Sequence, residues 1–124
     1  MTIDGEDDPL TRMVIGAAFT VSRALGHGFL EAVYKKALRV ELVAAGLTVT
    51  TEKAFPVFYR GEAVGTYIAD LVVADSLIVE LKTVESLGSA HSAQLLNYLK
   101  ASGISAGLLV NFGKPRVEVK RIVL

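Results

Sequence analysis

The spacing of hydrophobic residues changes along the chain and predicts where helices give way to strands. Near the N-terminus apolar residues recur every three to four positions, which is typical of amphipathic helices. From about residue 47 they alternate with polar residues or run continuously, which is typical of strands. The pattern predicts helices over residues 9–25, 28–45 and 89–101. It predicts strands over residues 47–59, 63–73, 77–83, 106–111 and 117–123.

The ends of the helices carry local signals. Asp8 is expected to cap the first helix and Pro9 to begin it, because proline lacks an N–H group that would be unpaired at that position. Gly46 and Gly103 are expected to end the second and third helices. The second helix has an expected apolar stripe, formed by Leu30, Val33, Ala37, Val40 and Ala44.

Individual strands differ in the environment that they predict. The run Leu77-Ile78-Val79 indicates a buried central strand. Pro56 places its strand at a sheet edge or in a bulge, since proline cannot donate to the ladder. The segment 117–123 alternates apolar and charged residues, which is typical of a half-exposed edge strand. The order ααβββαββ predicts an α/β sandwich with a mixed central sheet flanked by helices.

Composition limits the class of protein. The 124 residues predict one domain over residues 9–124, preceded by an acidic tail over residues 1–8. The absence of cysteine excludes a disulfide scaffold and any metal site built on thiolates. Hydrophobic residues make up 52% of the chain, which is an apolar surplus. We therefore expect further buried surface, most simply in a homo-oligomer such as a dimer.

Charge and hydropathy limit the partners. The 13 basic and 13 acidic residues cancel, which counts against tight binding of nucleic acid by the isolated chain. The apolar stretches around residues 13–19 and 107–110 are too short to cross a membrane. The first residues are acidic where a signal peptide would be basic, so we expect a cytoplasmic protein without membrane association.

Two acidic residues interrupt strands that are otherwise apolar. Asp70 lies in the second predicted strand, and Glu80 lies in the third, with Lys82 on the same face as Glu80. If Ala74-Asp75-Ser76 form a three-residue hairpin loop, Asp70 faces Glu80 with Cβ atoms about 5 Å apart. A two-residue loop would send the acids to opposite faces of the sheet. The alternative for Glu80 and Lys82 is simple exposure where the strand ends in solvent.

The two carboxylates suit a divalent cation. Placed on one face, they repel each other unless a cation lies between them. Asp70 and Glu80, with a nearby carbonyl such as that of Leu81, form an all-oxygen donor set that fits Mg²⁺ or Mn²⁺. Lys82 is then placed to position a water or to stabilise negative charge on a phosphate. The pattern favours metal-assisted hydrolysis of a phosphodiester.

The chain also resembles a known group of proteins. Asp70 followed by Glu80-Leu81-Lys82, after a helix and before a helix and a strand, resembles the core of the PD-(D/E)XK nuclease superfamily. The segment Gly28-Phe29-Leu30-Glu31-Ala32-Val33-Tyr34 resembles the signature of the GxxExxY family, a bacterial branch of that superfamily. Further similarity to that family is carried by His91-Ser92-Ala93-Gln94, Tyr98 and Asn111-Phe112-Gly113. The sequence departs from the superfamily pattern at Ala69, where proline often precedes the aspartate.

The resemblance implies a restriction-endonuclease-like fold and a role for each matching residue. Asp70 and Glu80 match the metal-binding acids, and Lys82 matches the catalytic lysine. Glu31 matches an acidic residue on the first core helix, and Gln94 matches a helix residue that flanks the site.

Each of the outlying residues also has a purely structural interpretation. Glu31 favours a helix N-terminus through the helix dipole, which explains it nearly as well as an active-site role. His91 and Gln94 lie one helical turn apart and are equally well explained as surface residues. Tyr34 and Tyr98 are candidates to flank the site, although packing at the core edge with a hydrogen-bonded hydroxyl explains them better.

Three classes of function remain open at this point. The expected one is a Mg²⁺- or Mn²⁺-dependent nuclease that acts on nucleic acid, DNA rather than RNA. The second is a catalytically silent module that keeps the fold and binds nucleic acid or assembles with other proteins, which the zero net charge and small size favour. The third is a structural or regulatory partner in a larger complex, which the apolar surplus suggests. Fold alone does not decide between them.

Overall fold

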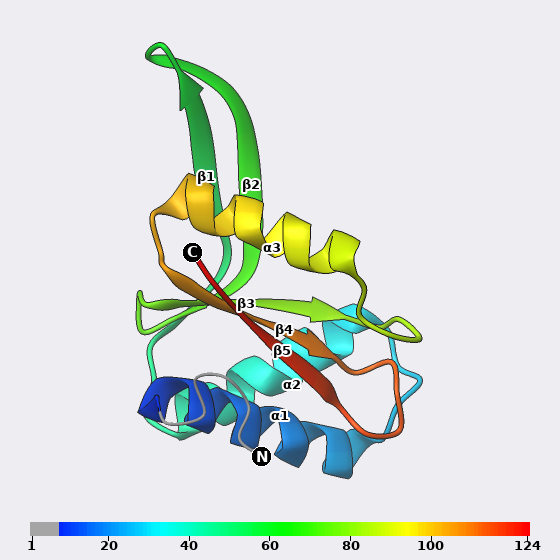
Figure 1. Cartoon of the computed structure of the whole chain (residues 1–124). Helices are drawn as coiled ribbons and strands as arrows, with labels where there is room; N and C mark the ends of the chain where they lie inside the picture. Colours follow the sequence, from blue (N-terminus) through cyan, green and yellow to red (C-terminus); the bar gives the residue numbers. More distant parts are fainter. Residues whose placement is uncertain (1–7) are drawn as a thin grey trace.

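The structure, a computed structural model, describes residues 8–124 (Figure 1). Its elements follow the predicted order ααβββαββ. The helices are α1 (Pro9–Leu25), α2 (Glu31–Ala44) and α3 (Ser89–Ser102). The strands are β1 (Val49–Tyr59), β2 (Glu62–Val73), β3 (Leu77–Lys82), β4 (Ala106–Asn111) and β5 (Glu118–Val123). The expected acidic tail lies outside the described residues except for Asp8, and the division into tail and one domain stays a prediction.

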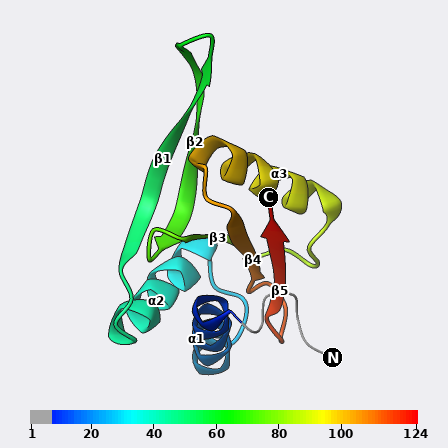
Figure 2. The same cartoon turned by 60° about the vertical axis from the view of Figure 1, so that its left-hand side comes forward.

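The five strands form one mixed sheet in the order β1-β2-β3-β4-β5. The pair β3–β4 is parallel, and the other neighbours are antiparallel. Helices α1 and α2 cover one face of the sheet and α3 covers the other (Figures 1 and 2). The predicted α/β sandwich with a mixed sheet is therefore confirmed, and the sheet is buried where the helices cover it.

The first helix begins as its sequence predicts. The side chain of Asp8 accepts hydrogen bonds from the backbone N–H of Leu10, at 3.3 Å, and from the hydroxyl of Thr11, at 2.8 Å. Pro9 takes the first helical position. This cap satisfies donors that a helix start leaves unpaired.

The second helix differs from the expectation in its start and in its buried face. It begins at Glu31 rather than near Gly28, because Gly28 has a φ of 115° and Leu30 has an extended backbone. The predicted stripe is wrong: Leu30, Val33 and Val40 are exposed. The buried positions are Tyr34, Leu38 and Leu42, one or two residues further along, while Ala37 of the predicted stripe is partly buried against the same core. The larger aromatic and leucine side chains fill the space over the sheet, which leaves the valines outside.

The hairpin between β2 and β3 has the predicted three-residue loop. Val73 pairs with Leu77 across Ala74-Asp75-Ser76, and the last paired residues are Leu71 and Val79. The next residues outward are Asp70 and Glu80. The register on which the candidate site depended is thus confirmed.

The opposite end of β2 forms a long hairpin with β1, which extends past the rest of the sheet beside α3 (Figures 1 and 2). As Pro56 predicted, β1 is an edge strand with a register shift, between Val57 and Phe58. Within residues 8–124, no helix is long and apolar enough to cross a membrane.

Candidate active site

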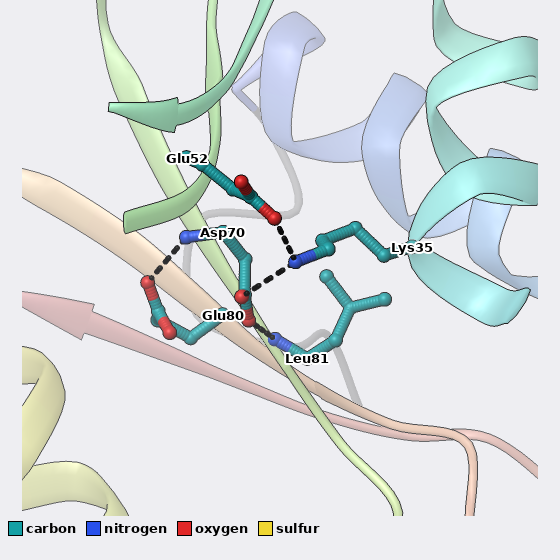
Figure 3. Close-up of polar contacts among 5 residues, drawn as sticks. All are labelled: Lys35, Glu52, Asp70, Glu80 and Leu81. Atoms are coloured by element: carbon teal, nitrogen blue, oxygen red, sulfur yellow. Dashed lines mark hydrogen bonds and ion pairs between the residues drawn. The ribbon is translucent and has the colours of Figure 1, made fainter. Parts of the chain in front are cut away.

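The two predicted acids meet where β2 and β3 stop pairing as regular strands (Figure 3). The backbone N–H of Asp70 donates to Oε1 of Glu80 at 2.9 Å. The backbone N–H of Leu81 donates to Oδ2 of Asp70, also at 2.9 Å. Each acid therefore accepts from the backbone of the opposite strand. These side-chain hydrogen bonds replace the backbone pairs that would otherwise continue between β2 and β3.

A break in strand alternation lets Asp70 reach beyond a single sheet face. Ala69 and Val72 both pack in the cluster beneath α3, while Leu71 packs on the side of α1 and α2. Opposite this point β1 is irregular, since Glu52 has a φ of 51° and the ladder skips it. The carboxylates are neighbours as predicted. Asp70 can also contact α2, whereas an acid in a regular cross-strand pair would face α3 only.

The side of Asp70 toward α2 is neutralised by a lysine. Lys35 Nζ lies 3.5 Å from Oδ1 of Asp70 and 3.1 Å from Oε1 of Glu52 (Figure 3). Lys35 and Asp70 are largely buried, with side chains 20% and 18% exposed, whereas Glu52 is 68% exposed. The Lys35 ammonium would thus compete with a divalent cation for the carboxylate of Asp70.

Glu80 is the buried acid of the site. Its exposed fraction is 6%, so the alternative that it simply emerges into solvent is wrong. Burial, and after it the adjacent negative charge of Asp70, raise the pKa of the Glu80 carboxyl to about 8. The N–H of Asp70 and the charge of Lys82 act in the opposite direction. Near neutral pH, without a cation, a proton therefore competes for this oxygen.

Lys82 and Gln94 are brought together on the α3 side of the sheet. Lys82 Nζ donates to Oε1 of Gln94 at 3.1 Å, and Lys82 is half-buried. Because an amide accepts only through its oxygen, the contact fixes the orientation of the Gln94 side chain. Gln94 is thereby placed beside the lysine that the sequence singled out.

Glu31 and Tyr98 border the carboxylates electrostatically. Burial and the charge of Asp70 raise the pKa of Glu31, while Lys82 and Lys35 oppose this. Burial and then the charges of Glu80 and Asp70 raise the pKa of Tyr98 to about 12. The Tyr98 ring lies edge-on to that of Tyr67, with centroids 5.0 Å apart. The negative charges of the acids thus act on both residues, on Glu31 from α2 and on Tyr98 from α3.

Tyr34 and His91 have structural contacts instead. Tyr34 is fully buried and its ring stacks on that of Phe112, with centroids 4.7 Å apart. Its hydroxyl donates to the carbonyl of Gly26 and accepts from the N–H of Phe29. The Nδ1 atom of His91 accepts from the N–H of Gly88 at the start of α3. The described contacts assign Tyr34 to the loop before α2 and His91 to a helix cap.

The chemistry of the donor set fits a magnesium-type ion. Mg²⁺ commonly takes one or two protein carboxylates and keeps several waters. Asp70 and Glu80 supply the carboxylates. The carbonyl of Leu81 points to the same side of β3 as its N–H, which is the side of Asp70. Within residues 8–124 no three His, Cys, Asp or Glu side chains gather as a larger ligand group. The clustered acids, one with a raised pKa, are a site where added positive charge is favourable.

Two site residues were missed from the sequence, Lys35 and Glu52. Lys35 lies one helical turn after Glu31, so the spacing alone puts both on one face of α2 and was an available signal. Glu52 had no such signal, because its approach depends on a left-handed backbone that glycine or asparagine more often adopts.

The comparisons with known proteins concern the family and the fold. A family model described as the PD-(D/E)XK nuclease superfamily matches residues 8–122. The fold is similar to the crystal structure of SSO0001, with a TM-score of 0.57 at 22% sequence identity. The alignment covers 97% of this chain and 59% of that one, so the chain spans a little over half of that protein's length. The comparison with curated proteins found no match.

Proposed function

The chain belongs to the PD-(D/E)XK nuclease superfamily, and from this premise we propose that it hydrolyses phosphodiester bonds of nucleic acid, DNA rather than RNA, with the help of a divalent metal ion. The observation that carries the proposal is the buried Glu80 carboxyl joined to Asp70 at the point where two strands part. A protein rarely buries adjacent acids without a compensating cation. The register and burial of this pair support a site at which a bound metal ion would offset the negative charge.

In this proposal Mg²⁺ or Mn²⁺ is held by Asp70, Glu80 and the carbonyl of Leu81. A bound ion would supply Lewis-acid stabilisation of the phosphate and would make a water more acidic. Asp70 is already oriented for this by the Leu81 N–H, and Glu80 by the Asp70 N–H. These backbone donors leave other carboxylate lone pairs for a ligand.

The remaining residues act on water and on phosphate. The Lys82 ammonium can donate hydrogen bonds to a phosphate oxygen or to the attacking water, and Gln94 holds it in place. Glu31 is proposed to orient a water from the α2 side, where burial and then the negative charge of Asp70 raise its pKa. Tyr98 and His91 are left as residues that flank this surface, and Tyr34 as one that supports it.

A cleavage assay tests the proposal. The protein is incubated with single-stranded, duplex and branched DNA and with RNA, in Mg²⁺ or Mn²⁺ and in chelator. We expect metal-dependent cleavage of at least one DNA and its loss in Glu80→Ala. The matched control is Glu85→Ala, which removes an exposed acid outside the site and should cut like the parent. Cleavage that persists in chelator, or in Glu80→Ala, would contradict the proposal.

The second candidate is a catalytically silent module with the same fold. It is favoured by the ion pair between Lys35 and Asp70, which neutralises the acid without a metal, and by the zero net charge. In that case the protein would neither cut nucleic acid nor bind Mg²⁺ better than Glu80→Ala does. Binding of nucleic acid without cleavage would then be the retained activity.

The assignment to the GxxExxY family is also part of the proposal. Its support is that the signature residues act together in the fold. Gly28 takes a φ of 115°, Tyr34 is bonded to the same loop, and Glu31 starts α2 on the side of Asp70. Gly28 and Tyr34 therefore fix the loop before α2, and this loop positions Glu31.

Self-association and location complete the proposal. We propose a homodimer formed through the β1–β2 hairpin, which leaves large apolar side chains exposed at Phe58, Tyr59, Val64 and Ile68. A two-stranded hairpin is marginally stable alone, and β1 has a free edge that a second copy could pair with. A cytoplasmic location is proposed from the sequence alone.

A further inference from the structure

A hollow of about 480 Å³ lies beside the candidate active site, between α2 and the beginning of β1. It is lined by Lys35, Lys36, Arg39, Val40, Thr51 and Glu52. Lys35 and Glu52 also belong to the polar cluster around Asp70 (Figure 3). The hollow and the acids are therefore parts of one continuous surface, joined at Lys35.

The charge of this hollow contrasts with that of the chain. Three of its six lining residues are cationic, although the whole sequence has equal numbers of acidic and basic residues. Lys36 and Arg39 lie three positions apart on α2, so their side chains share a face. Both are exposed, and within residues 8–124 neither side chain is in an ion pair or hydrogen bond. Two cationic side chains without an ion-pair partner therefore border the hollow.

We infer that this hollow binds backbone phosphates of the nucleic-acid strand that enters the active site, and the inference rests on the proposed function. Lys36 and Arg39 contact the phosphates, since Arg offers a planar fork of donors and Lys a mobile point charge. Lys35 links the hollow to Asp70, where the scissile bond is expected. Val40 and Thr51, both exposed, also line the hollow.

The recognised chemistry is phosphate in a polymer backbone. Phosphate contacts fix the position of a strand and carry no base information, so the hollow provides positioning without sequence preference. It also accounts for how a chain of zero net charge can hold a polyanion: the cations are concentrated at one place.

The test compares two double variants of equal charge. Lys36→Gln with Arg39→Gln empties the hollow of its free cations. Arg116→Gln with Lys120→Gln removes one arginine from the loop before β5 and one lysine from β5 itself, both exposed, and β5 is the sheet edge opposite β1. Binding of a fluorescein-labelled 20-base-pair DNA duplex is followed by anisotropy, in chelator so that no cleavage occurs, between 50 and 200 mM salt.

The hollow variant is expected to bind about tenfold more weakly at low salt, and its log–log salt slope is expected to fall by about 1.8, the value for two lost duplex phosphate contacts. The β5-edge variant should bind like the parent. Equal binding by both variants would overturn the inference and leave the nuclease proposal standing. If the parent bound no duplex and also cut none in Mg²⁺, both would fall.

A competition arm separates a polymer from a small phosphate. Inorganic phosphate and a mononucleotide are added at the same phosphate concentration as the unlabelled duplex that displaces half of the probe. We expect only the duplex to compete. Equal competition by inorganic phosphate would overturn the assignment to a strand backbone.

Discussion

At the scale of single residues, Glu80 is controlled by competing effects on one proton. Burial and the Asp70 charge favour the protonated form, while the Asp70 N–H and Lys82 favour the ionised form. The first two prevail because a carboxyl that is 6% exposed has lost most of its hydration. A divalent cation would reverse the balance and release the proton.

This balance predicts how the metal-free stability changes with pH. The folded protein holds the Glu80 proton between the ordinary pKa of 4.5 and the raised one of about 8, whereas the unfolded chain releases it. The free energy of unfolding should therefore fall across that range, by on the order of 1–3 kcal/mol. Urea unfolding in chelator at several pH values measures it. Glu80→Gln should flatten the slope and Glu85→Gln should not, and equal slopes in Glu80→Gln and the parent would refute the account.

The ion pair between Lys35 and Asp70 leads to a second prediction at this scale. The Lys35 ammonium lies 3.5 Å from Asp70, so it repels an incoming divalent cation. Lys35→Gln should bind Mg²⁺ about fivefold more tightly, corresponding to about 1 kcal/mol of removed repulsion. Calorimetric titration of Lys35→Gln beside Lys53→Gln tests this, since Lys53 is an exposed cation on β1. If both variants gained equally, net charge rather than the ion pair would be responsible.

At the scale of elements, short loops hold the site by specific contacts. After Lys82, the chain is fastened by Asn111, whose side chain accepts from the N–H of Val84 at 3.0 Å and donates to its carbonyl at 2.9 Å. Gly113 lies against the same loop, where a Cβ atom would meet backbone atoms of Val84 at 2.5 Å. The segment Asn111-Phe112-Gly113 thus sets where β3 ends and where Lys82 is held.

Gly113→Ala should therefore lower the free energy of unfolding by about 1–3 kcal/mol, because the backbone of the neighbouring loop must move. Gly16→Ala is the control, since a Cβ there would have open space and the residue lies inside α1 with no positive φ. Chemical denaturation of both variants measures the difference. A loss in Gly16→Ala as large as that in Gly113→Ala would show that the close approach is not the cause.

The sequence predicted local features well and long-range approaches poorly. The register of Asp70 and Glu80 followed from the length of one loop, because side chains alternate along strands. The buried face of α2 was misplaced, because its pattern also offered a stripe through Val33 and Val40 and packing against Phe112 decided between them. The approach of Glu52 depends on an irregular strand, for which no single residue gives a signal.

At the scale of the whole molecule, the exposed β1–β2 hairpin and the apolar surplus make one prediction, the proposed dimer. Light scattering at micromolar concentration should give about twice the mass of 13.2 kDa. Phe58→Ser with Ile68→Ser should shift the mass to that of the monomer, since both side chains are more than half exposed on the hairpin. Val123→Ser removes a similarly exposed side chain from β5 and should remain dimeric. A monomeric parent would contradict this part of the account.

The central claim, that Asp70 and Glu80 hold an ion beside which Lys82 acts on the substrate, is tested most directly by measuring ion binding and cleavage on the same variants. Calorimetry with Mn²⁺ and a DNA-cleavage gel are run on the parent, Glu80→Ala and Lys82→Ala. Glu80→Ala should lose both ion binding and cleavage, because a ligand is gone. Lys82→Ala should bind the ion at least as tightly as the parent, since an ammonium is not a ligand, and should lose cleavage. If Lys82→Ala cut like the parent, or if Glu80→Ala bound the ion unchanged, the assignment of roles would be contradicted.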